Sequence, residues 1–211
     1  MSALETALAH APIVAVVRST SRDDAERMAR AAALGGARVI EITFTVPDAD
    51  RLIARLRNDL PDVVVGAGTV RSSQQADAAG AADAQFLVSP VFDERVSERS
   101  AQLGIPFIPG AFSPTEIATA AAAGAHAVKV FPARVLGPSF VAATHEVLPD
   151  VRLMPTGGIE PDDVAAWLAA GAVAVGIAGA LSAAWRRHGE AGVSETTRAA
   201  IAAARTRRSD S

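Results

Sequence analysis

The sequence contains no cysteine. A chain without cysteine has no disulfide framework, no thiolate nucleophile and no cysteine-ligated zinc or iron–sulfur site. Its four histidines are scattered along the chain and show no spacing typical of metal ligands. We therefore expect neither a metal ion nor a cofactor.

The chain also has no excess of positive charge. The formal net charge is −3, and no stripe of basic residues interleaved with aromatic residues is present, so nucleic acid is not an expected partner. The chain does not open with a basic segment followed by an apolar one, which is the pattern of a secretory signal. We expect a cytoplasmic protein.

One uncharged stretch, Val164 to Trp185, is long enough to resemble a membrane span. It consists mainly of Ala and Gly rather than Leu and Ile, and several glycines interrupt it. The preceding Glu160–Asp163 segment is typical of a helix start. We therefore predict a helix that ends near Gly171, then a buried strand, and no association with a membrane.

Lysine is nearly absent: of the 20 basic residues, Lys129 is the only one that is not arginine. It lies inside the apolar segment Ala125–Pro132, where a solvated surface charge would not be placed. Arginine stays protonated and cannot act as an amine nucleophile, whereas a desolvated lysine can attack a carbonyl. A compositional drift towards arginine that spared one lysine by chance is the alternative, but it does not explain why that lysine lies in a strand. We predict a nucleophilic role for Lys129.

Short β-branched segments alternate with Ala- and Leu-rich helical segments along the chain. This alternation predicts right-handed β–α–β units, and eight strands in about 200 residues favour one (β/α)₈ TIM barrel domain over residues 1–211. A doubly wound sheet is the alternative, but the first strand ends at Val17–Thr20 without the glycine-rich turn of a dinucleotide-binding fold. We expect a short N-terminal helix within residues 1–11 and a polar, frayed tail at 205–211. The predicted strands are Ile13–Arg18, Arg38–Thr43, Val63–Thr69, Gln85–Ser89, Pro106–Pro109, Ala127–Phe131, Arg152–Thr156 and Ala172–Ile177.

Polar residues gather at the carboxyl ends of these strands, where a barrel builds its active site. Glu41 lies within the apolar strand that also holds Thr43. A buried carboxylate there indicates proton transfer, and a structural ion pair with Lys129 or Arg18 is the other interpretation. The two are compatible, because an acidic neighbour can orient a catalytic lysine.

Two glycine-containing turns follow the last two strands. Gly157 and Gly158 come directly after Thr156, and the Gly176–Gly179 turn holds the corresponding place after the final strand. Successive glycines can direct backbone N–H groups towards an anion, and this end of a barrel commonly holds phosphate. Each alone is compatible with an ordinary tight turn, but the pair predicts an anion site.

Six motifs occur in order along the chain: Glu41–Ala49, Val65–Val70, Val88–Pro90, Ile108–Gly110, Lys129–Ala133 and Met154–Ile159. Together they resemble the 2-keto-3-deoxy-6-phosphogluconate (KDPG) / 4-hydroxy-2-oxoglutarate (KHG) aldolase family, from about residue 12 to residue 182. The resemblance implies a metal-free class I aldolase on a (β/α)₈ barrel, with Lys129 as the Schiff-base lysine and Glu41 as the general acid and base. It also implies substrate contacts by Thr69, Thr156 and Pro90, phosphate contacts by Gly157 and Gly158, and a homotrimer.

Two departures from the family pattern concern the substrate's charged groups. Some members have an arginine four residues after the glutamate, where this chain has Thr45, so we expect Arg18 to hold the carboxylate. Members commonly have Gly-Ser in the last turn, where this chain has Ala178-Gly179. One hydroxyl donor is lost, although Gly179 keeps its backbone N–H group.

The resemblance implies cleavage of a phosphorylated keto-deoxy sugar acid into pyruvate and D-glyceraldehyde 3-phosphate, with Phe131 and Pro90 excluding water from the imine. Cleavage of unphosphorylated KHG, or of the galactonate epimer of the phospho sugar, stays open. So do a sugar-phosphate epimerase or isomerase barrel and a barrel that only binds sugar phosphates, although neither explains a buried lysine.

Overall fold

A computed structural model describes residues 2–206 of the chain. Strands and helices alternate as the sequence predicts, and every strand pairing is parallel. Within these residues the strands are β1 (Ile13–Val17), β2 (Val39–Thr43), β3 (Val64–Gly68), β4 (Leu87–Val88), β5 (Phe107–Ile108), β6 (Gly110–Ala111), β7 (Val128–Val130), β8 (Leu153–Pro155) and β9 (Val175–Ile177).

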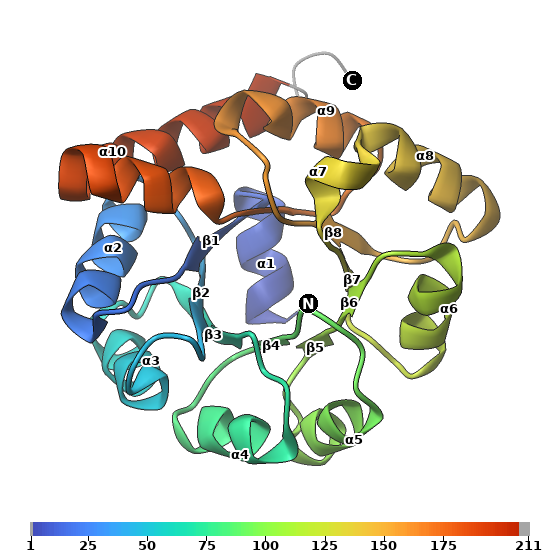
Figure 1. The fold of residues 1–211 in the computed structure, drawn as a ribbon, viewed down its shortest axis with the longest axis horizontal. Helices are drawn as coiled ribbons and strands as arrows, with labels where there is room; N and C mark the ends of the chain where they lie inside the picture. The colour runs from blue at the N-terminus through green and yellow to red at the C-terminus, as the bar shows by residue number, and fades with distance from the viewer. Residues whose placement is uncertain (1, 207–211) are drawn as a thin grey trace.

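The helices lie around the periphery and the strands lie inside them, with α1 in the centre of the view (Figure 1). Several helices start at a serine whose side chain accepts a hydrogen bond from the first turn, as Ser21, Ser72 and Ser113 do. The helices are α1 (Ala3–His10), α2 (Arg22–Leu34), α3 (Ala49–Asp59), α4 (Ser73–Ala81), α5 (Glu94–Leu103), α6 (Pro114–Ala122), α7 (Ala133–Leu136), α8 (Pro138–Val147), the 3₁₀ turn η1 (Pro161–Asp163), α9 (Val164–Ala169) and α10 (Gly179–Thr206).

The strands form two curled parallel sheets. The larger has the order β5-β4-β3-β2-β1-β9, and the smaller has the order β6-β7-β8. The predicted strand Pro106–Pro109 is divided, because Pro109 has no N–H group and separates β5, which pairs with β4, from β6, which pairs with β7. At the other junction a single parallel bridge joins Thr156 to Gly176.

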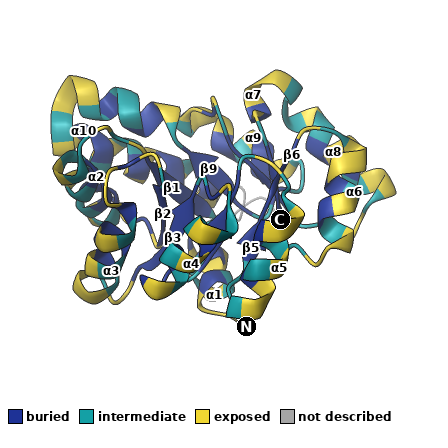
Figure 2. Cartoon of the chain, turned by 60° about the horizontal axis from the view of Figure 1, so that its bottom comes forward, coloured by how far each residue is buried: buried dark blue, intermediate teal, exposed yellow. Residues whose placement is uncertain are grey.

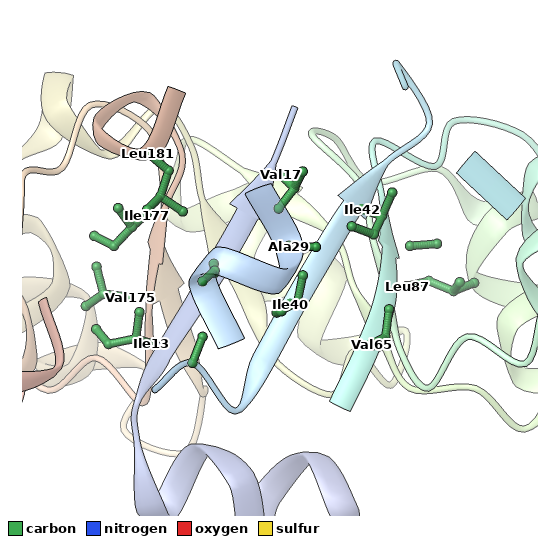
Figure 3. Close-up of a cluster of buried hydrophobic side chains, with 14 of the residues drawn as sticks. Ile13, Val17, Ala29, Ile40, Ile42, Val65, Leu87, Val175, Ile177 and Leu181 are labelled. Atoms are coloured by element: carbon green, nitrogen blue, oxygen red, sulfur yellow. The ribbon is translucent and has the colours of Figure 1, made fainter. Parts of the chain in front are cut away.

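The strands bury side chains on both faces, as their near-continuous apolar sequences predict. A large cluster fills the space between the strands and the outer helices, where Ile40, Ile42 and Val65 point outwards from neighbouring strands (Figure 3). The strands are buried along their length, while the peripheral helices expose their outward faces (Figure 2).

A second, smaller cluster lies on the inner face of the strands and includes the two buried leucines of α1, Leu4 and Leu8. The short helix expected near the N-terminus therefore covers the interior from one side, as its central place in Figure 1 indicates. The strand members of this inner cluster are Val14, Val16, Val39, Val64, Phe86, Val88, Ile108, Ala127, Met154 and Ala174.

An ionic cluster ties α1 to the strands. Nη1 of Arg152 donates to Oε1 of Glu5 at 2.9 Å, and the same nitrogen lies 3.3 Å from Nε2 of His126. Burial, and then the neighbouring Arg152 charge, hold the pKa of His126 below its ordinary value of 6.5, while Glu5 acts in the opposite direction.

This cluster predicts a loss of stability at mildly acidic pH. Unfolded His126 binds a proton near its ordinary pKa, whereas the folded protein binds it at lower pH, so the unfolded chain holds more protons as the pH falls below 6.5. We expect the urea midpoint to decrease between about pH 7.5 and pH 5.5, and to decrease less in His126→Gln. His188→Gln, which changes an exposed histidine, should behave as the wild type. An equal decrease in His126→Gln and the wild type would contradict the assignment.

The C-terminal part of the chain differs most from expectation. The stretch from Val164 to Trp185 contains α9, β9 and the start of α10, and within residues 2–206 no helix is long and apolar enough to cross a bilayer. The predicted elements end at Ile177, whereas the structure continues with α10, which is interrupted by non-helical backbone at Gly189 and extends to Thr206. Of the tail expected at 205–211, the first two residues are helical, and 207–211 lie outside the described part.

Candidate active site

Glu41 and Lys129 lie on the same inner face of the strands. Side chains two residues apart on a strand point to the same side, and Glu41 follows Val39 while Lys129 follows Ala127, both members of the inner cluster. Glu41 is 0% exposed and Lys129 is 5% exposed. The interior therefore receives one carboxyl group and the chain's single lysine amine.

The carboxyl group of Glu41 lacks the partner that burial ordinarily requires, and the amine of Lys129 lacks an ionic partner within residues 2–206. Both carboxyl oxygens of Glu41 lack a hydrogen-bond partner, and Lys129 forms no ion pair with a described residue; its Nζ lies 5.2 Å from the centre of the Phe131 ring. The structural ion pair considered for Glu41, with Lys129 or Arg18, is thus not formed. Because an unpaired buried polar group is costly, its presence points to a place where a ligand completes the contacts.

Thr156 adds a second buried group of this kind. It follows β8 immediately, is 2% exposed, and its Oγ1 has no hydrogen-bond partner. It lies two residues after the inner-cluster residue Met154, and a Cβ built on Gly176 would come within 2.3 Å of its Oγ1. Because Gly176 has no side chain, the Thr156 hydroxyl group fits beside it.

The end of β3 is shaped around Glu41. A Cβ built on Gly68 would lie 1.9 Å from Oε1 of Glu41, so only glycine leaves space for this carboxyl group. Thr69 follows with a φ of 58°, which is rare for a β-branched residue and marks strained backbone. Thr69 is among the site residues predicted from the sequence, and Gly68 is not. The signal for Gly68 is a glycine at the end of a strand, which often marks a close approach.

The glycine turn after β8 packs against the lysine's neighbour. Gly157 and Gly158 have φ values of 100° and 75°, which side-chain-bearing residues rarely adopt. The Phe131 ring covers Gly157, because a Cβ there would lie 3.0 Å from Cε2 of the ring. Gly158 is exposed, so its backbone faces the open side of the turn.

Gly179 begins α10 with open space around its α-carbon. The first intrahelical bond joins Ser182 N–H to Ala178 O, so the N–H groups of residues 179–181 have no acceptor within the helix. Such a terminus favours an anion.

The carboxyl ends of β1 and β2 are joined by hydroxyl groups. Oγ1 of Thr43 donates to Val17 O at 3.1 Å and lies 2.7 Å from Oγ1 of Thr45. Arg18 directly follows β1, is exposed, and forms no ion pair within the described residues. No direct contact brings Arg18 to the other predicted site residues.

Pro90 and Phe131 line a hollow of about 450 Å³ whose wall also includes Phe92 and Phe112. Lys129 and Glu41 do not line this hollow. The hollow therefore does not include the buried amine and carboxyl group, and Phe131 both lines it and lies 5.2 Å, at its ring centre, from Nζ of Lys129.

Comparison with known proteins agrees with this arrangement. The family model described as "KDPG and KHG aldolase" matches residues 4–190. The chain is 42% identical over 164 residues to 2-dehydro-3-deoxy-phosphogluconate aldolase of Treponema pallidum (strain Nichols), covering 77% of this chain and 78% of that protein. It is 32% identical over 168 residues to 2-dehydro-3-deoxy-6-phosphogalactonate aldolase of Escherichia coli (strain K12), covering 79% and 82%.

A solved structure shows the same fold. It is KDPG aldolase from Legionella pneumophila, with pyruvate captured at low pH as a covalent carbinolamine intermediate, and it superposes with a TM-score of 0.83 at 28% identity, covering 95% of this chain and 98% of that one. The resemblance found in the sequence motifs is thereby confirmed, and the chain belongs to the KDPG and KHG aldolase family.

Proposed function

We propose that this protein is a class I aldolase that reversibly cleaves 2-dehydro-3-deoxy-6-phosphogluconate to pyruvate and D-glyceraldehyde 3-phosphate. The observation that carries the proposal is the buried Lys129 amine, without an ion pair, on the same inner face as the unpartnered carboxyl group of Glu41. The Treponema pallidum relative is named for this substrate, and the carbinolamine in the Legionella pneumophila relative is the adduct that an amine forms with the pyruvate ketone.

The chemistry proceeds through an imine at Lys129. The neutral amine attacks the C2 ketone, and loss of water gives a protonated imine that draws electrons from the C3–C4 bond. Glu41 accepts the proton of the C4 hydroxyl group as that bond breaks and glyceraldehyde 3-phosphate leaves. The enamine that remains is protonated at C3 by the same carboxyl group, and water then releases pyruvate and restores the amine.

The other residues divide by the part of the substrate that each contacts. Arg18 and Thr69 hold the substrate's carboxylate, and Thr156 lines the substrate's carbon chain. Phe131 and Pro90 keep water from the imine. The phosphate is held by the backbone N–H groups of Gly157, Gly158 and Gly179.

We also propose a closed (β/α)₈ barrel and a homotrimer. The Thr156–Gly176 bridge and the short connection through Pro109 support closure of the strands. Val91 and Phe112, which are 53% and 43% exposed beside the hollow at Pro90, support a subunit interface there. The cytoplasmic location stays a prediction.

Other substrates of the family are the nearest alternatives. The galactonate epimer is one alternative substrate, because the Escherichia coli relative is named for it. Unphosphorylated KHG is another, because the last turn of this chain lacks a hydroxyl group. An epimerase or isomerase, or a barrel that only binds sugar phosphates, would leave the buried Lys129 amine without a role.

The substrate is tested by pyruvate release from the phosphogluconate compound, its galactonate epimer, KHG and the unphosphorylated keto-deoxy acid, with and without chelator. We expect kcat/KM to favour the phosphogluconate compound by about tenfold or more, which is about 1.4 kcal/mol of transition-state stabilisation, and chelator to have no effect. Faster cleavage of the galactonate epimer or of KHG would contradict the assigned substrate. Absence of pyruvate release from every compound would contradict the aldolase activity.

A further inference from the structure

Arg134 is an exposed arginine in the first turn of α7, directly after the Lys129–Ala133 motif. It is not among the site residues that the sequence predicts. Its guanidinium group forms no ion pair and no hydrogen bond within residues 2–206.

The backbone and the stem of Arg134 are both fixed on the Gly157–Gly158 turn. Its N–H donates to Gly157 O at 3.0 Å. A Cβ built on Gly158 would lie 2.7 Å from Cβ and 2.8 Å from Cδ of Arg134, so the methylene groups lie along the α-carbon of Gly158. The guanidinium, which begins one bond beyond Cδ, is therefore held at the edge of this turn.

Acidic neighbours do not neutralise Arg134. Glu160 and Asp163 share with it a hollow of about 270 Å³, yet neither carboxylate comes within ion-pair distance. Instead the two form a capping box, in which Asp163 Oδ2 accepts the backbone N–H of Glu160 at 3.3 Å. The positive charge of Arg134 thus stays available to a ligand.

A sugar phosphate needs that charge. The backbone N–H groups of the turn and of the α10 terminus are neutral donors, whereas a phosphate monoester is close to a dianion at neutral pH. Arginine is suited to this contact because its fork binds two phosphate oxygens at once and it does not lose its proton. We propose that Arg134 supplies the charged contact to the substrate's phosphate group and so sets a preference for phosphorylated over unphosphorylated substrates.

This inference rests on the proposed aldolase activity, and it is tested in the direction of aldol addition. Pyruvate is combined with glyceraldehyde 3-phosphate or with glyceraldehyde, in the wild type and in Arg134→Ala. Loss of a charge-assisted contact should raise KM for the phosphorylated aldehyde by about tenfold to a hundredfold, and leave KM for glyceraldehyde unchanged. Arg51→Ala, which removes an exposed arginine from α3 on the outside of the fold, should change neither value.

Three outcomes would overturn the role of Arg134: no change for the phosphorylated aldehyde, an equal change for both aldehydes, or a wild type without preference for the phosphate. Borohydride trapping of pyruvate separates this failure from that of the proposed function, because pyruvate carries no phosphate. If wild type and Arg134→Ala both trap pyruvate, the aldolase proposal stands whatever the aldehyde preference; if the wild type traps none, the proposed function itself fails.

Discussion

Replacing Lys129 with alanine is expected to abolish the borohydride-dependent covalent capture of pyruvate and to lower kcat by about 10⁴-fold or more. The imine requires a primary amine, and no other side chain of this protein offers one, because Lys129 is its only lysine. Trapping followed by intact-mass measurement therefore reports on one site, with only the amino terminus as a second amine. Peptide mapping distinguishes the two.

Lys129→Arg is the matched control, since it keeps the positive charge but cannot form the imine. It should be as inactive as Lys129→Ala. A covalent adduct that persists in either variant would contradict the Schiff-base role. Lys129→Met should be inactive yet at least as stable as the wild type, because it removes the charge of a residue that is 5% exposed and forms no ion pair. That combination would show that the lysine is retained for chemistry rather than for stability.

Local patterns in the sequence were sufficient for the order of the strands and helices. Apolar runs and helix caps are properties of a few neighbouring residues, and they placed Glu41 and Lys129 inside strands. They did not predict the division at Pro109, where a missing N–H group separates two sheets, or α10, which packs mainly against α2 and η1. Because α10 is interrupted at Gly189, its apolar residues do not keep one helical spacing along the whole element.

For the candidate site, too, local patterns predicted single residues but not the contacts between distant ones. The buried amine and the buried carboxyl group follow from polar residues in apolar strands, but their neighbours depend on which strands meet. The contact between Gly68 and Glu41 joins β3 to β2 across 27 positions of sequence, and the Arg134 stem reaches Gly158 from another unit of the fold. Such contacts form only when the strands have folded into curled sheets. A single sequence therefore shows the glycine or the arginine but not the residue that it contacts.

The Gly68 contact yields the second large effect. In Gly68→Ala the added methyl group would lie 1.9 Å from Oε1 and 2.5 Å from Cδ of Glu41, far inside van der Waals distance. Gly68 itself has no positive φ, so alanine fits the backbone and the Glu41 side chain has to move. A displacement of about 1 Å in a catalytic group lowers the rate by about a hundredfold. We expect kcat to fall by that factor and the exchange of the C3 protons of pyruvate to slow, because Glu41 moves those protons, while imine trapping at Lys129 continues.

Shortening the carboxylate side chain should relieve the clash and thereby show that Gly68 acts through Glu41. Glu41→Asp alone is expected to be slow, since its carboxyl group is retracted by one methylene group, but adding Gly68→Ala to it should cost little more. The two changes would then be strongly non-additive, as expected for residues in contact. Gly80→Ala in α4, where the nearest atoms to an added Cβ are 3.3 Å away on the flexible side chain of Leu103, controls for a general effect of replacing glycine. If Gly68→Ala and Glu41→Asp instead multiply their losses, the lost activity reflects damage to β3, and the space beside Gly68 does not position the carboxyl group.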